Sequence, residues 1–197
     1  MEQNIERHPW PPFIPSTPAR LLFMGTFPPK PSRYSMEFYY PNKINDFWRI
    51  MGLLFYGDAE ALYDRERGTF RLAEIKALLD AKGIAMGDTG AAVRRLKDNA
   101  SDKYLEIVEP VDLDSLLAAM PSLTYIATTG EKAAGVIAEL TGTEPPKMGE
   151  STTATWKDGR TLHLYRMPST SRAYPLPLAR KAEYYGLLLR EARVLAW

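Results

Sequence analysis

The sequence contains no cysteine and only two histidines, His8 and His163. Without cysteine the chain has no disulfide, no thiolate zinc site and no cysteine-ligated iron–sulfur cluster. Two histidines argue against a multi-histidine metal site, and a mechanism of the Ser-His-Asp type would have to use one of them. His163 lies on an expected strand, where we interpret it as structural.

Long apolar runs and an excess of charge are also missing. No run approaches the roughly 20 residues that span a bilayer, and the first ten residues show no signal-peptide pattern. We therefore expect a cytoplasmic protein that makes no membrane contact. The net charge of +1 lacks the strongly basic balance of many nucleic-acid-binding domains, but a local basic face on a neutral protein remains open.

The composition is otherwise that of an ordinary globular chain, with 45% hydrophobic and 25% charged residues among 197. This length predicts a single domain over residues 1–197. Residues 1–19 form its first segment, which we expect to be extended because it contains several prolines: Pro11, Pro12, Pro15 and Pro18.

Short apolar strands alternate with amphipathic helices along the rest of the chain. We expect strands at residues 20–24, 83–87, 123–128 and 161–165, the last in a hairpin with residues 152–156 around an Asp-Gly turn. Residues 104–108 alternate weakly and could form a further short strand. Helices are expected at residues 46–55, within 58–82, and at 113–120, 131–140 and 178–194, and the polar segment 94–103 is expected to be a loop, most simply a solvated one. This order predicts an α/β fold, a three-layer α/β/α sandwich with a central, mainly parallel four-stranded sheet.

The stretch from Gly25 to Met51 follows the first expected strand directly. It contains three prolines, five aromatic residues and two asparagines before a helix opens near Asp46. Open α/β folds bind their ligands at the carboxyl ends of parallel strands. Aromatic rings can stack on a flat heterocycle while amides contact its edge, which favours a binding loop, although the same rings could simply pack in the core.

Two segments together resemble the uracil-DNA glycosylase superfamily. Gly25 to Pro29 (GTFPP), followed by Tyr39-Tyr40 and Asn45 to Trp48 (NDFW), is similar to the superfamily's first motif. Met167 to Ala173 (MPSTSRA) resembles its second motif, the minor-groove loop, in the form seen in the mismatch-specific thymine/uracil and hypoxanthine-type branches. Between them, residues 83–88 (GIAMGD) are similar to a strand of the hypoxanthine-type branch.

The resemblance implies a monofunctional DNA N-glycosylase of base-excision repair. Such an enzyme flips a deaminated or mismatched base, such as uracil or hypoxanthine, out of the DNA stack and hydrolyses its N-glycosidic bond. It orients a water and stabilises the departing base, and it needs no metal and no cofactor. The implied partner is DNA containing such a base, and we expect a monomer.

The chain departs from the first motif at two positions. Several branches of the superfamily carry an Asn or Asp two residues after the first glycine, where it positions the water, and here that residue is Phe27. Pro29 replaces a glycine and removes a backbone N–H. The resemblance to the hypoxanthine-type branch carries the catalytic role to Asn45 instead, whose alternative role is to cap the helix behind it.

The resemblance also implies the remaining site residues. The base pocket is expected to contain Gly25, Thr26, Phe27, Pro28, Tyr39, Tyr40 and Asp88. Tyr39 or Tyr40 is expected to supply the ring that stacks on the base. Asp88 could equally be a helix cap or a buried hydrogen-bond acceptor. DNA phosphates are expected to meet Ser169, Thr170, Ser171 and Arg172, with Arg172 or Tyr174 as a possible wedge in the DNA stack. Lys132 could also reach a phosphate or could be a solvated surface lysine.

Two other functions fit the same residues. A non-catalytic nucleic-acid- or nucleotide-binding protein of this fold would explain Phe27 and Pro29. Hydrolysis of a free modified nucleoside is the third reading, and it predicts no continuous basic groove beside the pocket.

Overall fold

A computed structural model describes residues 4–97 and 101–196. At its centre lies a five-stranded sheet with strand order β5-β2-β8-β10-β9. Four strands run parallel, and β9 (Ser151–Thr155) pairs with β10 in the antiparallel direction. The parallel strands are β5 (Ile84–Asp88), β2 (Leu21–Gly25), β8 (Tyr125–Thr129) and β10 (Thr161–Met167). These four are the predicted strands, and the predicted hairpin adds β9 as a fifth strand at the edge.

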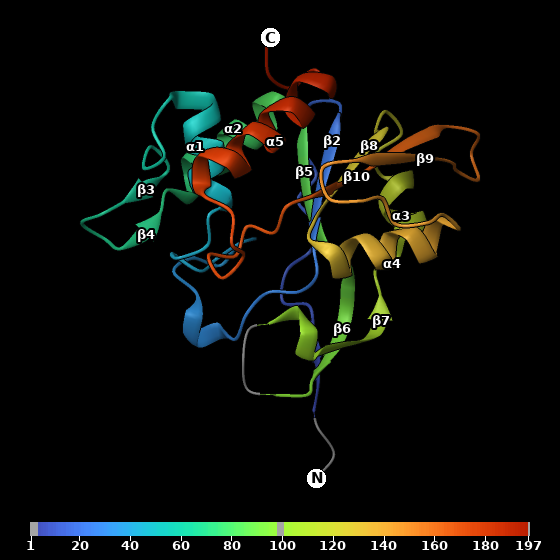
Figure 1. Cartoon of the computed structure of the whole chain (residues 1–197), viewed down its shortest axis with the longest axis horizontal. Coiled ribbons are helices and arrows are strands. Elements are labelled where there is room, and N and C mark those ends of the chain that lie inside the picture. Colours follow the sequence, from blue (N-terminus) through green and yellow to red (C-terminus); the bar gives the residue numbers. More distant parts are fainter. Residues whose placement is uncertain (1–3, 98–100, 197) are drawn as a thin grey trace.

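Helices cover both faces of this sheet, as Figure 1 shows. One face carries α1 (Phe47–Tyr56), α2 (Leu72–Lys82) and α5 (Leu178–Glu191), and the other carries α3 (Leu113–Ala118) and α4 (Glu131–Thr141). Strand β2 shows why: Leu21 and Phe23 belong to the first hydrophobic cluster, whereas Leu22 and Met24 belong to the second. A parallel sheet buried on both faces needs such continuously apolar strands. The three-layer α/β/α sandwich is therefore confirmed.

The helix ends follow the signals in the sequence. Gly57 ends α1 in the left-handed conformation, with a φ of 71°, which glycine adopts without steric cost. The Asp112 side chain accepts a hydrogen bond from the backbone N–H of Ser115 and so caps α3. Within the described part of the chain, no helix is long and apolar enough to cross a membrane.

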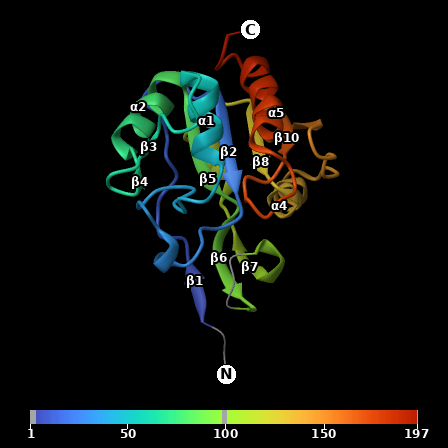
Figure 2. The same ribbon diagram turned by 60° about the vertical axis from the view of Figure 1, so that its left-hand side comes forward.

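A second, smaller sheet extends the molecule beyond the end of β5. Its three antiparallel strands have the order β1-β6-β7 (Figure 2), with β1 at Ile5–Arg7, β6 at Gly90–Arg95 and β7 at Leu105–Pro110. Strand β6 follows β5 after one residue, Thr89, so the chain runs from one sheet into the other. Short β3 (Tyr63–Asp64) and β4 (Thr69–Phe70) pair with each other, and 3₁₀ turns lie at Pro31–Arg33 and Asp102–Tyr104.

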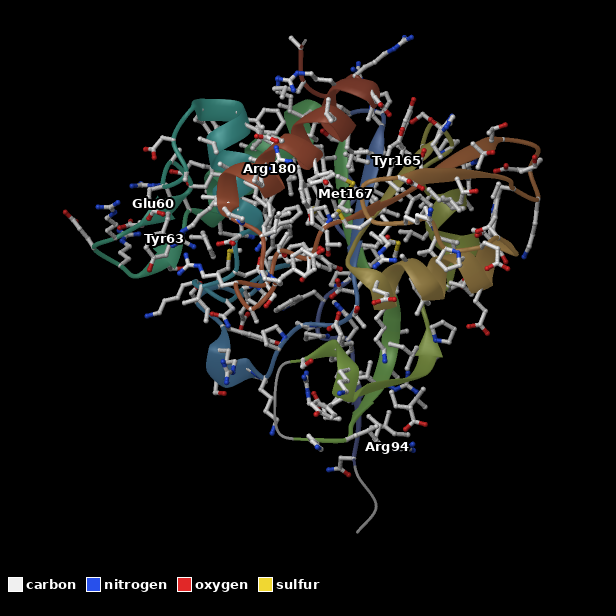
Figure 3. All side chains as sticks on the ribbon, in the orientation of Figure 1. Glu60, Tyr63, Arg94, Tyr165, Met167 and Arg180 are labelled. Carbon is white, nitrogen blue, oxygen red and sulfur yellow. The ribbon has the colours of Figure 1, made fainter. Side chains whose placement is uncertain are left out.

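Residues 94–103 were predicted to form a solvated loop, and this prediction is wrong for residues 94 and 95. Residues 98–100 of the segment lie outside the described ranges. Arg94 and Arg95 are strand residues of β6, and Arg94 lies at the end of the molecule far from Glu60 and Tyr63 (Figure 3). Arg95 is only 9% exposed because its Nε donates to Glu6 Oε1 at 2.9 Å and its Nη2 donates to the Pro28 carbonyl at 2.7 Å. Arg95 thus ties the small sheet to the loop that follows β2.

The strand register brings four strand ends to one edge of the main sheet. Gly25 of β2 pairs with Asp88 of β5, and Met167 of β10, which lies near the middle of the molecule in Figure 3, pairs with Thr129 of β8. The loops that leave these residues therefore lie at the carboxyl edge of the parallel strands, where open α/β folds bind their ligands.

Candidate active site

An open cavity of about 600 Å³ lies at this edge. It is large enough for a small molecule or a single flipped nucleotide. Six parts of the chain line it: the loop after β2, the segment before α1, the end of β5, the end of β8, residues 101 and 102, and the loop after β10. The lining residues are Gly25, Thr26, Phe27, Pro28, Pro29, Arg33, Tyr40, Pro41, Asn42, Ile44, Asn45, Asp88, Ser101, Asp102, Thr129, Ser169, Thr170, Ser171, Arg172, Ala173, Tyr174 and Pro175.

Gly25 lets the polar groups at the strand ends approach closely. A Cβ atom there would lie 2.9 Å from Asp88 Oδ1 and 3.2 Å from Tyr40 Oη. The Tyr40 hydroxyl is also 2.6 Å from Thr129 Oγ1. Only glycine leaves room for this arrangement, so the first residue of the loop is set by the packing of its neighbours.

Tyr40 presents an aromatic ring to the cavity. Its backbone is left-handed, with a φ of 52°, which is uncommon for a bulky residue and marks local strain. The ring stacks on Phe47, with centroids 4.1 Å apart and planes 8° from parallel. Burial, together with the Asp88 charge, raises the pKa of Tyr40 well above its usual value, so the hydroxyl stays protonated and can donate a hydrogen bond.

Asp88 is paired with a histidine from the N-terminal segment. Its Oδ2 lies at hydrogen-bond distance, 2.8 Å, from His8 Nε2. The other ring nitrogen of His8, Nδ1, lies 2.8 Å from the Trp10 carbonyl oxygen and 3.2 Å from the Trp10 backbone nitrogen, so the backbone of Trp10 holds the imidazole in place. Burial raises the pKa of Asp88, and the hydrogen bond and charge of His8 oppose that rise.

A second carboxyl group, Asp102, lines the same cavity. Its Oδ2 accepts a hydrogen bond from Thr26 Oγ1 at 2.9 Å. Burial raises the pKa of Asp102, and the nearby Asp88 charge adds to this rise, whereas the Thr26 hydrogen bond and the Lys132 charge oppose it. The cavity therefore holds two carboxyl groups that keep a proton at higher pH than an exposed aspartate does.

Asn45 lines the cavity, and its side chain is also bonded to the first turn of α1, in line with the capping alternative; its catalytic role stays a prediction. Its Oδ1 accepts a hydrogen bond from the backbone N–H of Phe47 at 2.9 Å. This bond orients the amide and directs its NH₂ group away from the helix end. An amide held in this way can bond a water or a ligand in the cavity.

A buried ion pair joins the two loops that the sequence motifs define. Asp46, next to Asn45, accepts hydrogen bonds from Lys181 Nζ at 3.0 Å and from Arg172 Nε at 3.1 Å. Lys181, whose side chain is fully buried, also donates to the Ser171 carbonyl at 2.8 Å, and the Asp46 backbone N–H donates to the Thr170 carbonyl at 2.9 Å. The loop after β10 is thereby fixed against the start of α1.

The structure brings most of the predicted site residues together. Of the set given above, Asn45, Gly25, Thr26, Phe27, Pro28, Tyr40, Asp88, Ser169, Thr170, Ser171 and Arg172 line the cavity.

Two predicted site residues do not line it. Tyr39 is 2% exposed and packs inward, where its hydroxyl donates to the Pro11 carbonyl at 3.1 Å. Lys132 donates from Nζ to the carbonyl of Leu105 on the small sheet and is therefore not the solvated surface lysine of the alternative.

The sequence reasoning missed His8 as the partner of Asp88, and it missed Asp102. His8 stood in a segment that predicted only extended chain, and Asp102 in one that predicted a solvated loop. Within the described ranges, no three His, Cys, Asp or Glu side chains gather closely enough to hold a metal ion.

The fold and the site define an α/β/α protein with a polar, aromatic-lined cavity at the carboxyl edge of its parallel strands. A solution structure of a protein from Methanosarcina acetivorans, described as a candidate uracil DNA glycosylase, is similar to this chain with a TM-score of 0.60 and 21% sequence identity. The match covers 96% of this chain and 99% of that one. The chain therefore has the uracil-DNA glycosylase fold, as the sequence motifs predicted. No family model matches the chain, and no curated protein does.

Proposed function

We propose that this protein is a DNA glycosylase that hydrolyses the N-glycosidic bond of a flipped-out deaminated or mismatched base, with uracil and hypoxanthine as the first candidates. One observation carries the proposal. Three separate segments that resemble superfamily motifs, at residues 25–28, 45 and 169–172, line one cavity together with Asp88. The similar fold supports the same class of activity, and the sequence motifs favour the hypoxanthine-type or mismatch-specific branch.

The cavity offers what a flipped base requires. The Tyr40 ring, held by its stack on Phe47, supplies an aromatic surface, and Phe27 supplies an apolar one. The carboxyl of Asp88 and the hydroxyl of Tyr40 lie beside the glycine at the end of β2, where they can bond the polar edge of the base. Stacking holds the base, and these polar groups select it.

The chemical step needs an oriented water and a stabilised leaving group. As the C1′–N bond lengthens, positive charge develops on the sugar and negative charge on the base. The Asn45 amide, fixed by its bond to the Phe47 N–H, directs its remaining hydrogen-bonding groups at a water in the cavity. The protonated hydroxyl of Tyr40 can donate to the base as its negative charge grows.

The loop after β10 provides groups that suit the DNA backbone. The hydroxyl groups of Ser169 and Ser171 can bond phosphate oxygens, whereas Thr170 is buried and is expected to hold the loop in place. Arg172 is half-exposed, and only its Nε is bonded to Asp46, which leaves the terminal nitrogens of the guanidinium directed to the outside. Phosphate contacts of this kind hold the DNA in register while the base occupies the cavity.

The proposal is tested by strand cleavage after alkali treatment. Labelled single- and double-stranded oligonucleotides carry uracil, hypoxanthine, xanthine or a G·T mismatch, and an undamaged strand is the control. Asn45→Ala is expected to lower the single-turnover rate about 10²-fold, as the loss of one oriented hydrogen-bonding group does elsewhere. It also removes a helix cap worth about 1 kcal/mol, so Asn45→Asp, which keeps the capping oxygen, separates the two effects.

Asn4→Ala, at an exposed position of the N-terminal segment, is the matched control and should cleave like the wild type. Cleavage that survives in both Asn45 variants would leave the glycosylase and remove Asn45 from its mechanism. A wild-type protein that binds DNA in a salt-sensitive way but cleaves none of these substrates would instead be the non-catalytic binding protein that Phe27 and Pro29 favour.

A further inference from the structure

The apolar side chain of Phe27 leaves one step of the proposed reaction without an obvious residue. The water that attacks the sugar must lose a proton, and a benzyl ring cannot accept one. Among the described residues that line the cavity, Asp88 and Asp102 carry the carboxyl groups that could do so. Which of them serves this role follows from their neighbours.

Asp88 is already engaged behind the cavity. Its side chain is 8% exposed, and its Oδ2 is hydrogen-bonded to His8 Nε2 at 2.8 Å. Its other oxygen, Oδ1, lies against the Gly25 backbone beside the Tyr40 hydroxyl. This arrangement makes Asp88 a fixed hydrogen-bonding group at the strand ends, suited to the edge of a base.

Asp102 instead lies next to the loop position that lacks a polar group. It accepts a hydrogen bond at 2.9 Å from the hydroxyl of Thr26, the residue immediately before Phe27, although 76 positions separate the two in sequence. A carboxyl group from the small sheet thus reaches the first motif from outside it. Asp102 also lines the open cavity.

We propose that Asp102 is the catalytic base of the reaction and replaces the Asn or Asp that the first motif lacks at Phe27. This inference rests on the glycosylase function proposed above. In the step, the C1′–N bond breaks and its electron pair leaves with the base. The oxygen of the water bonds C1′ and one water proton passes to the Asp102 carboxylate, which returns it to solvent, while the departing base takes a proton from solvent.

The surroundings of Asp102 suit this role. Burial and the Asp88 charge raise its pKa, which makes the ionised carboxylate a stronger proton acceptor than an exposed one. The charged and titratable groups that face it are Asp88 from β5, Lys132 from α4 and the neutral Tyr40 hydroxyl. The Thr26 hydrogen bond and the Lys132 charge oppose this rise in the pKa of Asp102.

The test compares single-turnover excision of uracil and hypoxanthine by the wild type, Asp102→Asn and Asp102→Glu. Asparagine keeps the hydrogen bond to Thr26 and the shape of the side chain but cannot accept the proton. We expect Asp102→Asn to lose about 10²-fold or more in rate, with substrate affinity changed less than about threefold, and Asp102→Glu to retain more activity. Asp114→Asn, at a half-exposed carboxylate on α3, is the matched control.

The pH profile supplies a readout that a structural role would not change. The wild-type rate should fall as the pH is lowered through the raised pKa of the base, and this fall should be absent from the residual rate of Asp102→Asn. An Asp102→Asn rate within about threefold of the wild type, or an acid fall that persists in this variant, overturns the assignment and makes Asp88 the candidate. If the wild type excises no base at all, the proposed function itself fails. If it excises and Asp102→Asn does too, only this inference fails.

Discussion

The buried pair between Lys181 and Asp46 supports the sharpest prediction for stability. Lys181 has no exposed side-chain surface, and its ammonium group donates to Asp46 Oδ2 and to the Ser171 carbonyl. Methionine at position 181 has a similar length but no charge and no donor. The change leaves Asp46, whose side chain is 10% exposed, with only the half-exposed Arg172 as a charged partner.

Breaking a buried ion pair by removing one partner costs about 3–5 kcal/mol, and the remaining Arg172 places Lys181→Met at the lower end, about 3 kcal/mol. For a chain of this length, 1 kcal/mol shifts the melting temperature by about 2–4 °C, so the expected fall is about 6–12 °C. Thermal and urea unfolding followed by circular dichroism measure it. A typical domain is stable by about 5–15 kcal/mol, so about 2–12 kcal/mol would remain and the variant should still fold.

An exposed pair on the same protein is the control. Lys157 and Asp114 also form an ion pair, but their side chains are 71% and 56% exposed. Solvent screens such a pair, so Lys157→Met should change the melting temperature by no more than about 2 °C. Equal shifts for Lys157→Met and Lys181→Met, or a loss below about 1 kcal/mol for Lys181→Met, would refute the reasoning from burial. The double variant with Asp46→Asn should be less destabilised than the sum of the single changes.

Three further predictions concern the cavity. Gly25→Ala places a methyl group 2.9 Å from Asp88 Oδ1 and 3.2 Å from Tyr40 Oη, so it should lower the excision rate at least about tenfold while the melting temperature changes by only a few degrees. Burial raises the pKa of Asp102 in the folded state above its value in the unfolded state. The contribution of Asp102 to the free energy of unfolding is therefore most favourable below the unfolded-state pKa, and it is lost as the pH rises through the folded-state pKa. Asp102→Asn should therefore melt higher than the wild type near about pH 8, with the gap closing toward about pH 4, and a gap that widens toward acid would contradict the sign. In His8→Gln, the loss of the imidazole that opposes desolvation should raise the pKa of Asp88, measured by an NMR titration of its carboxyl carbon; a fall in this pKa would show that His8 does not stabilise the carboxylate.

The main sheet could be predicted because its signals are local. The run from Leu21 to Met24 is apolar at every position, as a strand between two helical layers requires. The Asp-Gly turn predicts the hairpin of β9 and β10. The small sheet gives a weaker signal, because only the weak alternation at residues 104–108 indicates one of its strands, β7. Strand β1 has three residues and pairs with Arg94, Val93 and Ala92, far along the chain, so no local periodicity reveals it.

Local signals likewise revealed some of the site residues, whereas residues that depend on non-local contacts could not be found from the sequence. Sequence reasoning could not choose between Tyr39 and Tyr40, since adjacent aromatics look alike. The structure separates them by backbone conformation: the left-handed φ of Tyr40 directs its ring to the cavity and Tyr39 packs inward. Asp102 reaches the cavity only because β6 and β7 pair, a non-local contact that the sequence analysis did not anticipate.

These contacts also explain why Phe27 and the small sheet belong together. The Phe27 ring lies 5.3 Å from the His8 ring and 5.7 Å from the Arg95 guanidinium, and Arg95 holds the carbonyl of the next residue, Pro28. An aromatic at this position therefore anchors the small sheet against the first loop, which a short polar residue could not do. The sheet so anchored carries Asp102 to the cavity. Phe27 is thus compatible with the proposed reaction, because its ring helps to hold the segment that carries Asp102, the proposed base.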